Sequence, residues 1–309
     1  MQLLAFLYKR YMKKILVLSL IFLSSCSALG LNGHDQAKRD KELKAEIDAF
    51  ETPSVEKALY ESALTALEDN EYPKAEQYLK QLMKDHPDNP TYLQKYADLG
   101  RKMGKCKVSL SIYTALLAKD EGNLDFQEGK ALCQLQMGDY EKAGRAFTEI
   151  MEKDATRWRS INGAGLIFIS RKKYAEATQY FTLASEVSGE DPSVLNNMGL
   201  TKALVGNYTD AIDILKKAST SSKEVPEQKR RVDLNLALVY GISGDFDSAK
   251  ATAAPHLTEP QLYNNLGIYS ELAHQPELAK TYLNKALAST TIYYDRAWEN
   301  LDRLDKGGR

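Results

Sequence analysis

Cysteine and histidine have the greatest capacity for covalent or metal chemistry in this sequence, and they are few. The 309 residues include three cysteines and four histidines. None of the histidines lies at metal-ligand spacing from a cysteine or a carboxylate; they are His34, His86, His256 and His274. The sequence contains neither a phosphate-binding glycine-rich loop nor a Gly-x-Ser-x-Gly elbow. It therefore predicts a protein that is not an enzyme, with no catalytic residue, metal, cofactor or small-molecule substrate. A nucleophile–base pair assembled only in space is the alternative.

Cys26 stands at the end of a short secretory signal. Residues 12–14 are Met-Lys-Lys, and the apolar run 15–23 follows them. A span of the bilayer needs about 20 apolar residues, so this run predicts a cleaved signal rather than an anchor helix. Residues 1–11 fit poorly ahead of it, which indicates Met12 as the true start. The quartet 23–26 (LSSC) resembles the bacterial lipobox, in which the cysteine thiol is acylated and the chain is cleaved just before it.

The lipobox resemblance implies a location. Two or more acyl chains, such as palmitate, hold a protein durably on a membrane. Ser27 follows Cys26, where an aspartate would imply retention in the inner membrane. We therefore expect a lipid-anchored protein at the periplasmic face of the outer membrane of a Gram-negative bacterium. The alternative is an ordinary signal peptide that happens to contain a cysteine.

Charge and composition exclude one class of partner. The formal net charge is −1, with 41 Lys and Arg against 42 Asp and Glu. Without a basic surplus there is little to attract phosphates, so we expect no nucleic-acid partner. The sequence is rich in Ala, Leu, Lys and Glu and contains only nine prolines, which favours helices.

Three series of residues recur at a 34-residue interval. The first consists of small residues: Ala63, Ala97, Ala131, Gly165 and Gly199. The second, also small, runs in step with it: Ala75, Ser109, Ala143, Ala177 and Ala211. The third is mostly aromatic: Tyr72, Cys106, Tyr140, Tyr174 and Tyr208. The interval and the residue types are typical of the tetratricopeptide repeat, a pair of antiparallel helices.

Helix packing explains this pattern. A small residue in each of the two helices lets them approach closely, whereas bulky residues at both places would push the pair apart. Larger apolar residues are expected to fill the seam: Leu79, Tyr113, Phe147, Phe181 and Leu215. The aromatic after each turn is expected to be a core residue wedged between repeats. The predicted fold is an all-α, right-handed superhelical solenoid of about seven repeats with a C-terminal capping helix.

The register slips after Gly199. The next small residues are Ala237 and Gly267, so one interval is four residues longer and the next four shorter. We expect the extra residues in a longer loop over 220–227, and a truncated second helix near Pro255 and Pro260. The predicted divisions are a signal peptide (1–25), a lipidated Cys26 with a polar tether and a cap helix (26–52), the repeat array (53–288), and a capping helix with a tail (289–309). The last helix is expected from about residue 292 to 304, carrying Trp298 and Leu301.

Cys106 and Cys133 form an even pair once Cys26 is assigned to lipid. An oxidising compartment favours a disulfide between them. The helix predicted to carry Cys133 runs antiparallel to the one carrying Cys106, and a bond would link neighbouring repeats. It would stabilise the fold by about 3.5 kcal/mol in the chain-entropy treatment. Two buried free thiols are the alternative.

Asparagines gather on the first helices of the later repeats, which line the concave face in this fold. They lie two or three residues before the small residue: Asn162, Asn196, Asn197, Asn235, Asn264 and Asn265. An aliphatic residue follows the small one: Leu166, Leu200, Leu238 and Ile268. A ladder of amides beside an apolar stripe suits a bound peptide, so we predict a peptide-binding groove here. The alternative is a structural role in which the asparagines satisfy neighbouring helices.

Four runs in the carboxyl-terminal third narrow the resemblance. They are 231–238 (RVDLNLAL), 244–249 (GDFDSA), 264–267 (NNLG) and 293–301 (YYDRAWENL). With the LSSC quartet and the array, they resemble TadD-type proteins, tetratricopeptide lipoproteins of the tight-adherence (Flp, or Tad) pilus assembly system. The resemblance implies a pilotin-like adaptor that binds a segment of the outer-membrane secretin or another pilus component. Alternatives are a scaffold for cell-wall synthesis or outer-membrane protein assembly, or, in another class, an enzyme accessory or a sugar-binding module.

Overall fold

The computed structural model describes residues 54–290 and 294–307, and all regular structure in these residues is helical. The chain divides into two compact units, Met1–Ala58 and Leu59–Arg309, and the second holds nearly all of the described residues. Cys26, the predicted signal peptide, the tether and the cap helix within 26–52 lie outside the described residues. Within those ranges, no helix is both long and apolar enough to cross a membrane.

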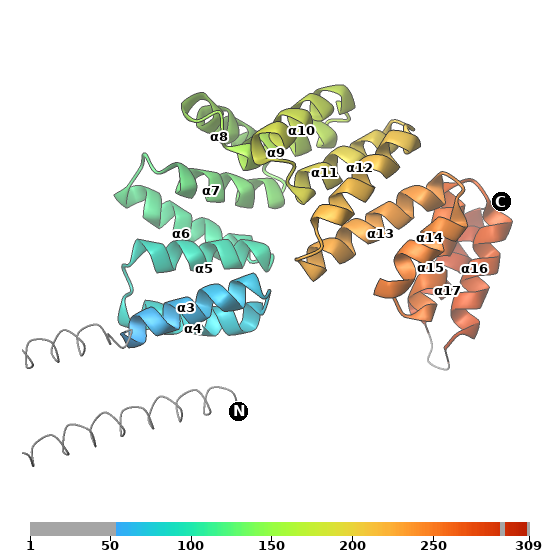
Figure 1. Cartoon of the computed structure of the whole chain (residues 1–309), viewed down its shortest axis with the longest axis horizontal. Coiled ribbons are helices and arrows are strands. Elements are labelled where there is room, and N and C mark those ends of the chain that lie inside the picture. Colours follow the sequence, from blue (N-terminus) through green and yellow to red (C-terminus); the bar gives the residue numbers. More distant parts are fainter. Residues whose placement is uncertain (1–53, 291–293, 308–309) are drawn as a thin grey trace, which may run out of the picture. The chain divides into compact units, whose positions relative to one another are not determined.

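In residues 54–290, seven pairs of helices follow one another, and Figure 1 shows their order. We number the pairs as repeats 1 to 7. Repeats 1 to 4 are α3 (Val55–Glu68) with α4 (Tyr72–Asp85), α5 (Pro90–Lys102) with α6 (Cys106–Lys119), α7 (Leu124–Gln136) with α8 (Tyr140–Lys153), and α9 (Trp158–Ser170) with α10 (Tyr174–Ser188). Repeats 5 to 7 are α11 (Pro192–Leu204) with α12 (Tyr208–Ser221), α13 (Pro226–Ile242) with α14 (Phe246–Ala253), and α15 (Glu259–Leu272) with α16 (Pro276–Ala288). The last helix is α17 (Asp295–Gly307).

The turn inside each repeat has one conformation. Its residue seven positions after the small one has a positive φ, between 57° and 94°, in every repeat: Asn70, Gly104, Gly138, Lys172, Gly206, Gly244 and His274. The next residue donates its backbone N–H to a carbonyl five positions back, as in the Lys105 to Gly100 bond of 2.7 Å. This is the Schellman ending of a helix, for which glycine is the residue of lowest cost. Lys172 and His274 adopt the left-handed conformation without that advantage.

Small residues set the distance between the two helices of a repeat. All residues of both small series are buried. A Cβ atom added to Gly165 would lie 2.6 Å from the ring of Phe181, and one added to Gly199 would lie 2.7 Å from Leu215. The five predicted seam residues are fully buried, which confirms the packing prediction. The turn aromatics are less buried than predicted, since Tyr140 is exposed and only Cys106 of that series is buried.

Alanine at two glycines is expected to have opposite effects. In Gly165→Ala, overpacking of about 1–3 kcal/mol outweighs the gain in helix propensity, because the new methyl group meets the Phe181 ring. Gly144 lies inside α8, where an added Cβ would sit 3.5 Å from Ile167, an ordinary contact. Gly144→Ala is therefore expected to stabilise the protein by about 0.5–1 kcal/mol. Urea unfolding of the two variants checks the signs, and equal effects would contradict this account of the helix spacing.

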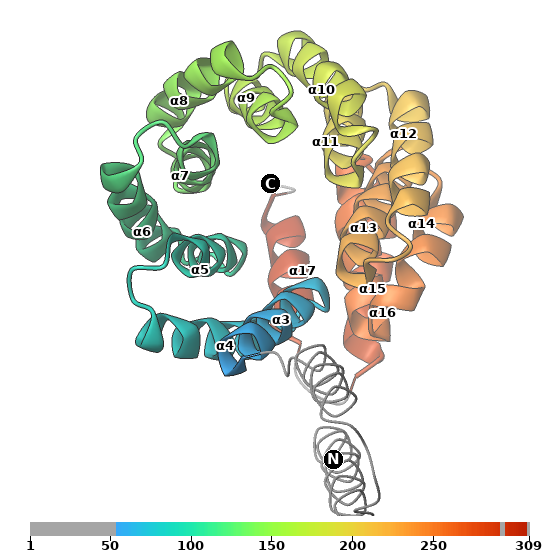
Figure 2. The same cartoon turned by 60° about the vertical axis from the view of Figure 1, so that its left-hand side comes forward.

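The repeats stack into a solenoid. From α4 to α17 each helix packs against the next, and from α5 onwards each first helix also contacts the first helix of the following repeat. Ala63 of α3 and Ala75 of α4 share one core cluster. Figure 2 shows α5, α7 and α9 in one layer and α6, α8 and α10 in another. The predicted all-helical repeat solenoid is confirmed.

The four extra residues of repeat 6 do not lengthen a loop, so that prediction is wrong. Four residues connect α12 to α13, as many as connect α6 to α7, and α13 has 17 residues where α11 has 13. Pro226 at the first turn of α13 explains the difference, because proline is preorganised for a helix start. The predicted truncation is confirmed: α14 has eight residues and continues as a 3₁₀ turn, η1 (Ala254–His256).

Helix α17 covers the apolar end of repeat 7. Ala297 is buried in a cluster with Leu283 and Ala286, and Leu301 packs against that cluster. Trp298 is 50% exposed and so contributes less to the cap than predicted. The start expected near residue 292 falls outside the described residues.

Candidate functional site

The predicted asparagines bond to one another across repeats. Asn197 donates its Nδ2–H to Asn162 Oδ1 at 3.0 Å, and Asn235 donates to Asn196 at 2.8 Å. A third bond of 3.0 Å runs from Asn300 of α17 to Asn264. We call these three pairs the amide ladder. They join α9 to α11, α11 to α13, and α15 to α17.

The amide ladder follows a rule of position. The acceptor lies three residues before the small residue of its helix, and in the first two pairs the donor lies two residues before the small residue of the next repeat. The rule fails between α13 and α15, because the acceptor position there is Leu234. Asn265, at the donor position, instead bonds to Tyr269, whose pKa is raised by burial against the opposing effect of that bond.

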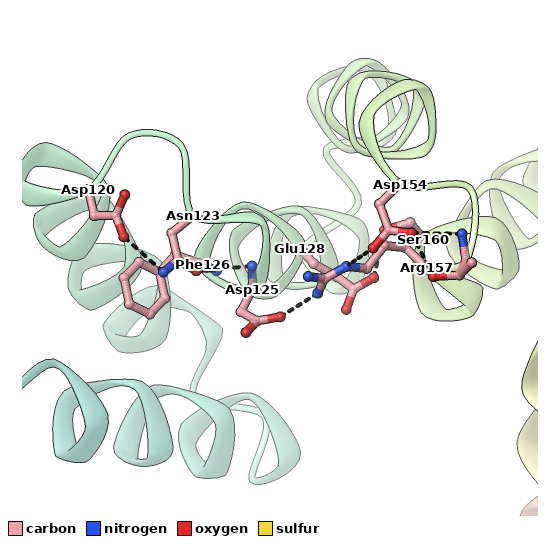
Figure 3. A network of polar contacts seen from close by, with 9 residues as sticks. Asp120, Asn123, Asp125, Phe126, Glu128, Asp154, Arg157 and Ser160 are labelled. Carbon is pink, nitrogen blue, oxygen red and sulfur yellow. Dashed lines mark hydrogen bonds and ion pairs between the residues drawn. The ribbon is translucent and has the colours of Figure 1, made fainter.

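An acid replaces the asparagine acceptor in α7. Glu128 is buried, and the donor position opposite it is Gly163, where a Cβ would lie 2.5 Å from the Phe147 ring. Ser160, about one turn earlier in α9, donates to Glu128 Oε1 at 2.7 Å instead. Figure 3 shows this contact between the two helices. The first helices are thus joined by polar bonds from α7 to α13.

Arg157 adds a second link beside Glu128 (Figure 3). Its guanidinium forms an ion pair with Asp125 of α7 and donates to Asp154 at 3.0 Å. The pKa of Arg157 is raised by the hydrogen bond to Asp125. Asn123 caps α7 by accepting the backbone N–H of Asp125 at 3.1 Å. These contacts fix the entry of α9 against α7.

The pairing shows which asparagines could reach a ligand. Asn196 and Asn264 are 5% and 4% exposed and accept a bond inside a helix–helix contact, so the prediction that they line a ligand surface is wrong. Four asparagines are partly exposed: Asn162, Asn197, Asn235 and Asn265. The structural role that the sequence left open therefore holds for the two buried residues, and ligand binding by the other four stays a prediction.

Sequence reasoning missed the exposed part of the apolar stripe. The four predicted aliphatic residues, Leu166, Leu200, Leu238 and Ile268, are only partly exposed. One turn further along, Leu204 is 57% and Leu272 is 54% exposed, and Ile242 occupies the same position between them. The spacing of four residues places each pair on one helix face, and this spacing was the available signal. We call the six residues of α11, α13 and α15 the aliphatic row: Leu200, Leu204, Leu238, Ile242, Ile268 and Leu272.

His256 belongs to a partly buried polar cluster that links α12, α13 and η1. Its Nε2 lies 2.8 Å from Asp233 Oδ2, and Lys229 Nζ lies 2.7 Å from the same oxygen. Ser219 also donates to Asp233. Burial raises the pKa of Asp233, but the hydrogen bonds from Lys229, Ser219 and His256 outweigh it, so the pKa is lowered. The serine bonds to the carboxylate and not to the histidine, which is the arrangement of a structural ion cluster rather than of a nucleophile with its base.

Asp233→Asn is expected to destabilise the protein by about 1.5–3 kcal/mol at neutral pH, the cost of losing hydrogen bonds to a charged group. The lowered pKa makes the carboxylate's contribution complete above its unfolded pKa of about 3.9. The contribution is lost as pH falls through the lower folded pKa. Urea unfolding from pH 7 to pH 2 should show a constant gap between wild type and variant that closes below about pH 4. A gap that persists at pH 2 would contradict this sign.

Cys106 and Cys133 are unbonded thiols in this structure, and both are buried in one core cluster. Burial, together with a hydrogen bond to Cys106, raises the pKa of Cys133 to about 12. Cys106 Sγ also donates to Gln136 Oε1 at 3.1 Å. The helices bring the two sulfurs together as predicted, and the disulfide itself stays a prediction. Intact mass after alkylation, with and without reductant, distinguishes the bonded pair from free thiols.

Candidate metal ligands do not gather in residues 54–290 and 294–307: no group of three or more histidine, cysteine, aspartate or glutamate side chains there is placed to hold an ion. Four asparagines of α9, α11 and α13 are bonded to one another in pairs. Together with the aliphatic row, they make a surface suited to binding a chain segment.

Two tetratricopeptide-repeat family models match the sequence, over residues 57–89 and 97–157. The fold is that of tetratricopeptide-repeat proteins. Among solved structures, a tetratricopeptide repeat protein from Parabacteroides merdae is 21% identical, with a TM-score of 0.51 over 81% of this chain and 98% of its own. TTC0263 of Thermus thermophilus is 14% identical, with a TM-score of 0.53 over 59% and 99%. Pseudomonas aeruginosa pilF is 14% identical, with a TM-score of 0.51 over 71% and 97%.

These likenesses establish the fold. A sequence comparison with curated proteins finds no match. Tetratricopeptide repeats imply a scaffold for protein–protein interaction, and proteins built from them are typically non-catalytic. The partners expected of this fold are peptides or proteins.

Proposed function

We propose that this chain is a non-catalytic, lipid-anchored adaptor that holds a partner protein on the aliphatic row. The observation that carries the proposal is the exposure of Leu204 and Leu272 on either side of Ile242. Consecutive first helices in contact present these residues as one surface. Apolar side chains aligned over three helices, two of them more than half exposed, mark an interaction site better than single exposed residues do. An amphipathic helix or an extended apolar segment fits such a surface.

Partly exposed asparagines beside the row would orient the bound segment. Asn197 and Asn235 each use one amide hydrogen for the amide ladder, which leaves Oδ1 and a second hydrogen for a ligand. An amide can accept from a backbone N–H and donate to a carbonyl, so a peptide would be held without a requirement for its charge. The aliphatic row would supply the affinity, and the asparagine amides would fix the register of the bound segment.

The partner that we propose is the secretin of a tight-adherence (Flp) pilus, or another component of that assembly system. The support is the resemblance of the runs at 231–238, 244–249, 264–267 and 293–301 to TadD-type proteins, together with the LSSC quartet ending at Cys26. Acylation of Cys26 would hold the adaptor at the periplasmic face of the outer membrane, where a secretin assembles. Its work would be targeting or multimerisation of the secretin, by binding and positioning alone.

Affinity purification of the lipidated chain from outer membranes tests the proposal. We expect a secretin to co-purify with the wild type, and Cys26→Ser to move the chain out of the outer-membrane fraction. Recovery from outer membranes without any secretin or other pilus component would overturn the pilus assignment. Recovery with a penicillin-binding protein or a barrel-assembly protein would instead assign the adaptor to cell-wall synthesis or outer-membrane protein assembly.

A further inference from the structure

The helix face that carries the aliphatic row in repeats 5 to 7 is charged in repeat 2. The row occupies the positions one and five residues after the small residue, and in α5 these positions hold Asp98 and Lys102. Lys95 occupies the donor position of the amide ladder, two residues before the small residue. Spacings of three and four residues place these side chains on one face of α5. Arg101, next to Lys102 in the chain, adds another charge.

The Arg101 guanidinium is partly buried without a partner. Its Nε is buried and has no hydrogen-bond partner, and it is the one such side-chain atom in residues 54–290 and 294–307. The side chain also forms no ion pair with a described residue. A buried charged donor that is left unsatisfied is costly. Because the residue is partly exposed and its charge is spread over three nitrogens, an anion at the outer edge of the guanidinium would compensate the whole group.

The carboxylate nearest to Arg101 in its own helix is engaged elsewhere. Asp98 lies three residues earlier, and its Oδ1 accepts the Tyr113 hydroxyl at 2.6 Å. Burial and the charge of Asp98 raise the pKa of Tyr113, and the positive charge of Arg101 opposes them. The guanidinium therefore lies near this hydrogen bond but forms no ion pair with the carboxylate. Asp98 leaves the charge of Arg101 unpaired.

Further cations share this surface. Arg159 lies in the first turn of α9, and its guanidinium carbon is 4.4 Å from the centre of the Trp158 ring. Helices α5 and α9 belong to one layer of the stack (Figure 2). Desolvation lowers the pKa of Lys102, and so do the positive charges of Arg101 and Arg159. The two helices thus hold their cations close enough to repel one another. We call four residues the cation cluster: Lys95, Arg101, Lys102 and Arg159.

The acidic residues around the cation cluster do not neutralise it. Helices α5, α7 and α9 carry three acidic residues, and each is engaged: Asp98 with Tyr113, Asp125 with Arg157, and Glu128 with Ser160. In α3, Glu61 and Glu68 occupy the positions that Lys95 and Lys102 have in α5, but no ion pair joins these residues. The cation cluster therefore has an excess of positive charge, which is complementary to an acidic ligand.

We propose that the cation cluster is a second binding site, which holds an acidic stretch of a partner protein. One side-chain carboxylate of the stretch pairs with the outer edge of Arg101 and with Lys102, and a second pairs with Arg159. Two acids are needed because the cations come from α5 and α9. The site goes beyond the aliphatic row, which begins only in α11. One adaptor can therefore hold an apolar segment on the row and an acidic stretch on the cation cluster.

A random heptapeptide library displayed on phage tests this proposal. Each peptide is fused to the coat protein through its carboxyl end, so the acids that it offers are side chains. The library is selected on the full chain in detergent and, in parallel, on Arg101→Met/Lys102→Met. We expect peptides rich in aspartate and glutamate to be enriched on the wild type only. A selected peptide synthesised with both ends blocked should bind the variant at least about tenfold more weakly, and its glutamine-substituted form should bind the wild type equally weakly.

Two variants separate binding from support of the fold. Arg101→Met removes a guanidinium whose Nε has no partner, so the urea midpoint should stay the same or rise while the acidic peptides are lost. A lower midpoint would show that Arg101 supports the fold, which would overturn its role here. Arg159→Met changes an exposed residue and should also lose the peptides, even if the double variant fails to fold.

Two controls locate the site. Lys107→Met removes an exposed lysine of α6 that forms no ion pair, and it should bind as the wild type does. Leu204→Gln/Leu272→Gln disables the aliphatic row without adding charge and should leave acidic-peptide binding intact, so the two sites fail separately. Selection of no peptides, of peptides without acidic residues, or of peptides that bind Arg101→Met/Lys102→Met as tightly as the wild type would overturn the proposal.

Discussion

Replacing Phe181 with alanine is expected to lower the free energy of unfolding by about 3–5 kcal/mol. The ring is fully buried, and the atoms of Gly165 approach it so closely that the site has no spare volume. Phe181 shares a core cluster with Ile161 of its own repeat and Val194 of the next. The substitution would therefore open a cavity where three helices meet and weaken the contact between repeats 4 and 5.

Urea unfolding followed by circular dichroism measures this loss. Leu183→Ala is the matched control, because Leu183 lies in the same helix but is exposed. A change within about 0.5 kcal/mol is expected there. In a solenoid each repeat contacts only its neighbours, so Phe181→Ala is also expected to broaden the transition by uncoupling the two halves. A loss below about 1 kcal/mol would mean that the helices collapse onto the cavity, contrary to the rigid spacing inferred from Gly165.

Predictability of the fold varied with the physical origin of each feature. The small residues and their bulky partners are intrinsic to helix packing, so their recurrence, at 34 residues in the first five repeats, predicted about seven pairs and the buried seam. The four extra residues of repeat 6 could have lengthened either the loop before α13 or the helix itself. Pro226 favours the longer helix, because proline is preorganised for the first turn of a helix. The polar, proline-containing stretch 220–227 therefore predicts a loop, although it contains the start of α13.

The site was less predictable because similar side chains have opposite roles one residue apart. Asn196 and Asn197 are neighbours in α11, but the first is buried as an acceptor and the second is partly exposed as a donor. A rotation of about 100° per residue separates their directions, and the sequence alone does not place the neighbouring helix.

Leu204→Lys/Leu272→Lys is expected to weaken partner binding at least about 100-fold, equivalent to about 2.7 kcal/mol. Binding would bury two ammonium groups against an apolar segment without counter-ions. The free protein should tolerate both lysines, because the two side chains are more than half exposed and each ends its helix. A cation in the last turn interacts favourably with the helix dipole. The change in the free energy of unfolding should therefore stay within about 0.5 kcal/mol.

Titration of a periplasmic secretin fragment into each variant measures this effect by calorimetry. Leu183→Lys is the matched control, since it places the same charge on an exposed leucine of a second helix, away from the row. It should bind like the wild type. Asn197→Ala separates a role in orienting the bound segment from a role in supporting the fold. It removes the hydrogen bond to Asn162 and should lower the free energy of unfolding by about 0.5–1.5 kcal/mol, besides any loss of binding. Wild-type affinity in the double-lysine variant would show that the partner does not use the aliphatic row, and a large loss of stability would show that these leucines support the fold instead.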